Sequence, residues 1–161
     1  LWVDHYWCKT YILFGNELYM KQLDSYYYFR LGLNLYEKVT LSVREKYGLS
    51  YMEFVVLLFL ANNEEYKKAS DIVEILGIAK SHVSATVNTL VEKGLIERTT
   101  DYSDKRSSIL EINDSAKEII EEGRRAQKEY HNLVFGSLSD DEIKELGRLQ
   151  KIIENNIKEN L

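Results

Sequence analysis

A short charged tetrapeptide, Asp104-Lys105-Arg106-Ser107, carries residue types that suit binding to an anionic surface. A guanidinium such as that of Arg106 can enter a narrow A·T-rich minor groove, where the negative potential of DNA is enhanced. Asp104 lies two residues away and faces the same side of an extended segment, so we expect it to hold Arg106 in position. Lys105 is better suited to touch a phosphate. The alternative is a solvated surface ion pair, which contributes little to stability.

Two short apolar segments flank this tetrapeptide, 95–98 on one side and 108–112 on the other, and both have the composition of strands. Upstream, two short helical patterns meet at Gly77, and the second runs from Lys80 to Lys93. The order helix, glycine-containing turn, helix, strand, charged tip, strand is that of a winged helix-turn-helix. That unit places one helix in a DNA major groove and a charged hairpin beside it.

The helix predicted from Lys80 to Lys93 should present two different faces. Its inward stripe is Val83, Val87 and Leu90. Its outer face carries the residues that we expect to contact DNA. They are Lys80, Ser81, His82, Ser84, Ala85, Asn88 and Thr89. Asn can pair bidentately with adenine, and an Ala or Thr methyl can touch a thymine methyl. Ser and His near a helix N-terminus suit phosphate. The alternative is an ordinary polar helix face.

Further helices are predicted around this unit. Gly48 suits the end of the first one, and Ser50-x-x-Glu53 is a capping-box pattern opening the second. Ser70 is the expected cap of the short helix before Gly77. The predicted ranges are 23–47, 51–61, 70–76, 80–93 and 113–135, with a last helix after Ser139. The expected fold class is mainly α with a small β-hairpin wing.

Composition sets further bounds on a chain of 161 residues. The longest apolar run, 54–61, is far shorter than the ~20 residues of a membrane helix. The net charge of −5 argues mildly against a generic nucleic-acid binder, and the stretch 80–106 is nearly neutral, so phosphate contacts should be few. The single cysteine, Cys8, suits a reducing cytoplasm. We expect residues 1–19 to be an extension of uncertain status and 20–161 to form a single domain.

The stretch from Ile72 to Ser107 resembles the DNA-binding lobe of MarR-family regulators. The resemblance rests on the Gly77 turn, on the Leu-x-x-Lys-Gly-Leu-Ile-x-Arg run at 90–98, and on Asp104, Arg106 and Ser107 of the wing. It implies a homodimer in which helices at about 21–47 and 114–160 interlock, flanking a winged unit at about 50–112. Such proteins are commonly repressors released by a small ligand, a metal or an oxidant. Many members carry arginines at the positions that are Ala85 and Thr89 here.

The resemblance therefore predicts a cytoplasmic dimeric repressor that binds double-stranded DNA at an inverted-repeat operator. A small-molecule effector is possible, with Tyr26 and Tyr28 as candidates for its cleft. We expect no cofactor and no metal, because the three histidines lie far apart without ligand spacing. Cys8 lies outside the matching region, which favours a bystander over a redox sensor.

Two other function classes compete with this interpretation. One is a protein-binding or anti-repressor module that keeps the fold but has lost DNA binding, which the acidic net charge favours slightly. The other is an enzyme, which the sequence does not support because it contains no nucleophile elbow, phosphate-binding glycine loop or coherent acid–base pair.

Overall fold

The computed structural model describes residues 22–100 and 108–161, without the side chains of 22–26 and 28. It is mainly helical with one two-stranded antiparallel hairpin, as predicted. The elements are α1 (Gln22–Lys46), α2 (Tyr51–Asn62), α3 (Ala69–Leu76), α4 (Lys80–Glu92), β1 (Ile96–Thr100), β2 (Ser108–Ile112), the short 3-10 helix η1 (Asp114–Ala116), α5 (Lys117–Phe135) and α6 (Asp140–Lys158).

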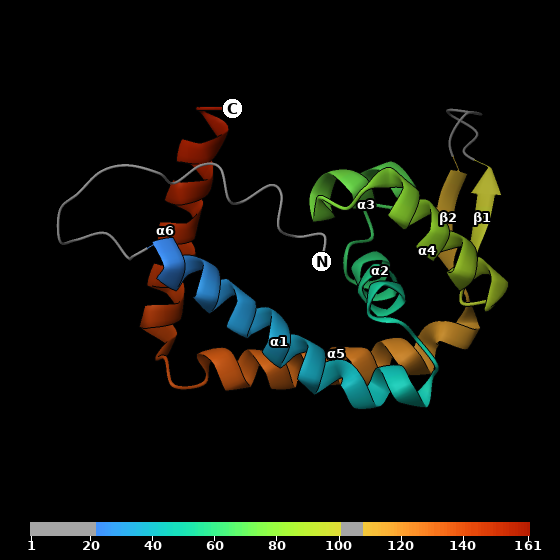
Figure 1. The fold of residues 1–161 in the computed structure, drawn as a ribbon, viewed down its shortest axis with the longest axis horizontal. Helices are drawn as coiled ribbons and strands as arrows, with labels where there is room; N and C mark the ends of the chain where they lie inside the picture. The colour runs from blue at the N-terminus through green and yellow to red at the C-terminus, as the bar shows by residue number, and fades with distance from the viewer. Residues whose placement is uncertain (1–21, 101–107) are drawn as a thin grey trace.

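The long helices α1 and α5 pack along each other and form the base of the molecule (Figure 1). A lobe made of α2, α3, α4 and the hairpin sits over one end of this pair. Helix α6 leaves from the other end of α5 and stands well apart from that lobe in Figure 1. The C-terminal end of the chain is therefore displaced from the winged unit.

Helix α2 lies at the centre of the core because its sequence is apolar nearly all round. Phe54, Val56 and Leu57 have no exposed surface, and Leu58 has almost none. The predicted inward stripe of α4 is confirmed, since Val83, Val87 and Leu90 are fully buried. These three side chains fix which face of α4 is turned outward.

A glycine follows each of the two helices of the helix-turn-helix. Gly77 ends α3 before the turn to α4, and Gly94 follows α4 before the hairpin. Gly77 and Gly94 have φ of 64° and 67°, a left-handed conformation that residues with a Cβ rarely adopt.

The prediction that Ser70 caps the short helix is wrong. Helix α3 begins at Ala69, and the Asp71 carboxylate reaches back to accept a hydrogen bond from the Lys68 N–H at 2.8 Å. Ser70 instead falls in the first turn.

Hydrogen bonds join the hairpin to the chain before α3 and to the end of α4. The register pairs Ile96 with Ile112 and Arg98 with Leu110. Leu110 N–H donates to the carbonyl of Lys67, which precedes α3, at 2.7 Å. Asn113 and Ser115 both donate side-chain hydrogen bonds to the Gly94 carbonyl. The base of the wing is thereby held against α3 and the end of α4.

Among the described helices, none combines the length and the apolar character needed to cross a membrane.

Helix α5 approaches α2 most closely at Gly123, which is buried. A Cβ at this position would lie 2.9 Å from Leu58 Cδ2 and 3.1 Å from both Leu58 Cδ1 and Phe54 Cε2. The first of these distances is shorter than carbon atoms tolerate, so a side chain here requires the buried Leu58 side chain, or one of the two helices, to shift.

Gly123→Ala should therefore destabilise the protein, by roughly 1–3 kcal/mol as is usual for overpacking a core. The measurement is urea unfolding at one fixed protein concentration. Leu58→Ala should also destabilise, because it leaves a cavity. The double variant should lose less than the sum of the two single losses, since trimming Leu58 makes room for the new methyl. Strictly additive losses would contradict the steric explanation.

Candidate nucleic-acid interface

The outer face of α4 carries the residues that the sequence singled out. Lys80, Ser81, His82, Ser84, Ala85 and Asn88 are exposed, and Thr89 is half-buried. They lie opposite the buried stripe and form one surface on α4, in which most side chains are polar and most are small. We call this set the α4 outer face. A surface of small side chains allows the close approach that a major groove requires.

The first turn of α4 presents backbone donors outward. Ala79 precedes the helix and has no side chain to cap it, and the first N–H groups of a helix have no partner within that helix. Lys80, Ser81 and His82 are exposed at this end. The positive end of the helix dipole and these side chains together favour a phosphate.

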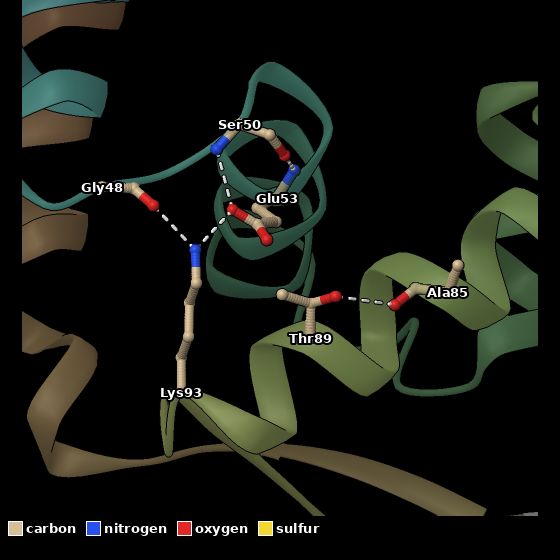
Figure 2. Close-up of polar contacts among 6 residues, drawn as sticks. All are labelled: Gly48, Ser50, Glu53, Ala85, Thr89 and Lys93. Carbon is tan, nitrogen blue, oxygen red and sulfur yellow. Dashed lines mark hydrogen bonds and ion pairs between the residues drawn. The ribbon is translucent and has the colours of Figure 1, made fainter.

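Thr89 contributes differently from what its type alone suggests. Its hydroxyl donates to the Ala85 carbonyl of its own helix at 3.1 Å (Figure 2). Thr86 makes the equivalent bond to the His82 carbonyl at 2.9 Å, but it is buried. Since the Thr89 hydroxyl donor is used within the helix, Thr89 can offer DNA an acceptor oxygen and its methyl group, and the methyl suits an apolar contact with a thymine methyl.

Arg98 of β1 reaches the α4 outer face. Its Nη2 donates to Asn88 Oδ1 at 2.6 Å, and both residues are exposed. A charged donor makes such a hydrogen bond shorter and stronger than one between neutral groups. In the sequence Arg98 is the last residue of the Leu-x-x-Lys-Gly-Leu-Ile-x-Arg run at 90–98, which predicts no contact for its side chain. The structure brings it beside Asn88, the candidate base-contacting residue.

A polar junction fixes the C-terminal end of α4. Lys93 Nζ donates to the Gly48 carbonyl at 2.7 Å and to Glu53 Oε2 at 2.8 Å (Figure 2). The same Glu53 oxygen accepts the Ser50 N–H at 2.7 Å, and the Glu53 N–H donates to Ser50 Oγ. The junction therefore joins the end of α1, the start of α2 and the end of α4. It confirms the predicted capping box and adds a lysine to it.

The Glu53 carboxylate is charged in this environment. Burial by itself raises the pKa of the Glu53 carboxyl, but the hydrogen bonds from Lys93 and Ser50 outweigh it and hold the pKa below its ordinary value. The Glu53 side chain is only 9% exposed, whereas that of Lys93 is 34% exposed. Lys93 is therefore directed at the junction, and the basic surface near α4 is smaller than the sequence suggests.

Several predicted site residues cannot be placed. Asp104, Lys105 and Arg106 of the wing tip, and Cys8, lie outside the described residues. Tyr26 and Tyr28 belong to α1, but their side chains are not among those described. Within the residues that are described, no group of three or more His, Cys, Asp or Glu is arranged to hold a metal ion.

Sequence reasoning did not identify the roles of Arg98 and Lys93. Alternation along β1 could have indicated Arg98, because it shares a face with Ile96, which is almost fully buried. Lys93 gave no such signal, because its partners lie 40 and 45 residues earlier in the chain.

Lys93→Met should lower the free energy of unfolding by roughly 1–3 kcal/mol near neutral pH, because a buried carboxylate loses its charged partner. Since the folded-state pKa of Glu53 is depressed, its contribution is present above the ordinary carboxyl range and is lost as the pH falls through the folded-state pKa. The deficit of Lys93→Met relative to wild type should therefore shrink in acid. Urea unfolding at about pH 7 and about pH 3 measures this difference. Lys93→Arg keeps the charge and should recover part of the loss. A deficit that is the same at both pH values would contradict the ion-pair account.

Comparison with known proteins agrees with this architecture. The MarR family model matches residues 47–107. An uncharacterized HTH-type transcriptional regulator of Bacillus subtilis, YwaE, is 29% identical over 133 residues, which is 79% of this chain and 74% of the relative.

Two solved structures share the fold over most of the chain. One is a MarR-family transcriptional regulator from Listeria monocytogenes complexed with a 26mer DNA; it is 17% identical with a TM-score of 0.73, over 84% of this chain and 89% of that one. The other is CouR from Rhodococcus jostii RHA1 bound to p-coumaroyl-CoA; it is 18% identical with a TM-score of 0.68, over 85% and 95%. The match of residues 47–107 to the MarR family model and the similarity to an HTH-type regulator support a MarR-family winged helix-turn-helix regulator, and the chain has the fold of the solved MarR-family structures.

Proposed function

We propose that this regulator binds double-stranded DNA as a homodimer at an inverted-repeat operator, and represses transcription until a small-molecule effector releases it. The observation that carries the proposal is the α4 outer face, which is small, polar and exposed beside the hairpin. In such a unit this helix enters the major groove while the hairpin lies along the flanking backbone.

The charges and groups on this face fit selective binding. Lys80 and the α4 N-terminus supply phosphate contacts, whereas Asn88 and the Ala85 and Thr89 methyl groups can touch base edges. Few cations are present, so affinity depends more on base contacts than on counterion release. Arg106, held by Asp104, remains our predicted minor-groove contact, and Lys105 our predicted phosphate contact.

An exposed apolar surface supports the homodimer. Along the described length of α6 no residue is buried, although Leu149, Ile152 and Ile153 are large apolar side chains exposed by 43–55%. A groove on this helix is lined by Leu138, Leu146 and Leu149 together with the acidic residues Asp141, Glu142 and Glu145. Leu31 of α1 is exposed as well. Adjacent large apolar side chains left exposed on a helix suit an association surface, and a second copy of the chain supplies the matching one. Helices at about 21–47 and 114–160 would then form the dimer and leave the winged unit free.

Effector control would release the regulator from DNA when a small molecule binds. It rests on the family and on CouR, whose structure holds p-coumaroyl-CoA. The region of Tyr26 and Tyr28 on α1 remains our candidate for the effector cleft.

Ala85→Glu should weaken binding to an operator from the protein's own promoter by roughly 2 kcal/mol or more, because it directs a carboxylate at the DNA. The measurement is a fluorescence-anisotropy titration at several salt concentrations. Lys128→Glu, on the exposed surface of α5, is the control. It changes the net charge more than Ala85→Glu does but should affect binding less. If wild type itself fails to bind, the protein-binding alternative gains support.

Leu149→Asp combined with Ile153→Asp should abolish the dimer, because burying two carboxylates in an apolar interface is strongly unfavourable. Light scattering on the purified full chain should report monomer in place of dimer. Lys151→Asp with Lys144→Asp changes two exposed charged positions of the same helix and should leave the dimer intact. A dimer that persists in the first variant would contradict the assignment of α6 to the interface.

A further inference from the structure

We propose that Asn88 and Arg98 act as one unit that selects guanine over adenine in the major groove. The proposal rests on the proposed DNA binding and adds a specificity rule to it. It starts from the 2.6 Å hydrogen bond from Arg98 Nη2 to Asn88 Oδ1.

The direction of this bond determines how the amide of Asn88 is turned. A guanidinium has five N–H donors and no acceptor. The amide group that faces it must therefore be the oxygen, whichever way the side chain is drawn. The Asn88 Nδ2, which donates two hydrogens, is consequently turned away from Arg98.

The backbone holds both residues where this pair can face DNA. Arg98 follows Ile96 by two residues on β1 and shares its face, and Ile96 is only 1% exposed. Asn88 is exposed on α4, and its neighbours one turn earlier are Ser84 and Ala85, both small. The strand thus delivers a guanidinium to the α4 outer face, next to a helix that carries no arginine of its own.

The pair offers hydrogen-bond donors to the groove. Guanine presents two acceptors there, N7 and O6, whereas adenine presents the N7 acceptor and the N6 donor. Bidentate pairing of Asn with adenine needs Oδ1 as an acceptor for N6–H. Arg98 takes one of the two lone pairs of that oxygen and keeps a charged donor beside it, so the N6 donor would have to approach next to a second, cationic donor, which disfavours this pairing. The unit therefore matches guanine and mismatches adenine, which replaces the adenine preference expected from Asn88 alone.

The test selects binding sites from a randomised inverted-repeat DNA library with the full chain. Wild type should enrich guanine at one position of each half-site. Arg98→Ala should lose that preference on the order of tenfold and gain adenine at the same position, because no cationic donor then stands beside Asn88 Oδ1. Arg98→Lys keeps the charge without the planar fork and should retain less guanine preference than wild type. Replacing the selected guanine by 7-deazaguanine should weaken wild type more than Arg98→Ala.

Lys80→Ala is the matched control for the loss of one positive charge. Lys80 is exposed at the start of α4, and its removal should weaken binding to all sites without changing the preferred base. If wild type and Arg98→Ala prefer the same bases and the variant only binds more weakly, Arg98 is a phosphate contact. That result would overturn the Asn88–Arg98 proposal but leave the proposed DNA binding standing. Adenine at that position in wild type would overturn the Asn88–Arg98 proposal too. If wild type selects no sequence at all, the proposed DNA binding fails along with it.

Discussion

Helix α2 has almost no polar face, so its neighbours must cover it on nearly every side. Seven of its residues are buried, and the core cluster extends from them to α4, β1, β2 and α5. This requirement places α5 against α2 at Gly123 and turns the Val83 stripe of α4 inward. The orientation of the α4 outer face is therefore a consequence of burial elsewhere, because burying one side of a helix exposes the other.

Packing alone leaves α4 free to slide or tilt slightly along α2, and polar contacts limit that freedom. Lys93 fixes one end of α4 to Gly48 and Glu53, while Arg98 contacts Asn88 nearer its middle. Apolar burial thus selects the face, and directional hydrogen bonds select the position along it. Base contacts need this second kind of control, because their geometry tolerates little displacement.

The sequence predicted the fold well because its strongest patterns are local. The Val83, Val87 and Leu90 spacing, the Gly77 turn and the Ser50–Glu53 cap all depend on residues within a few positions of one another, and the structure confirms them. The Ser70 cap was wrong because α3 begins one residue earlier, at Ala69, with the Asp71 carboxylate accepting the Lys68 N–H. The role of Lys93 was not predictable in this way, since it depends on how separate elements meet in space. Alternation along β1 indicates the face of Arg98 but not its partner Asn88 on α4. The wing tip is a prediction still, because Asp104 and Arg106 lie outside the described residues.

The shared oxygen of Glu53 also bears on how the molecule opens locally. One atom accepts both the Ser50 N–H that caps α2 and the Lys93 ammonium that holds α4, and Lys93 at the same time satisfies the Gly48 carbonyl at the end of α1. Loosening the end of α4 removes Lys93 from both of the other helix ends, and loosening either of those removes a partner from Lys93. The α1–α2 junction and the end of α4, 40 or more residues apart in the chain, therefore form one cooperative opening unit, whose amide hydrogens should exchange with solvent together.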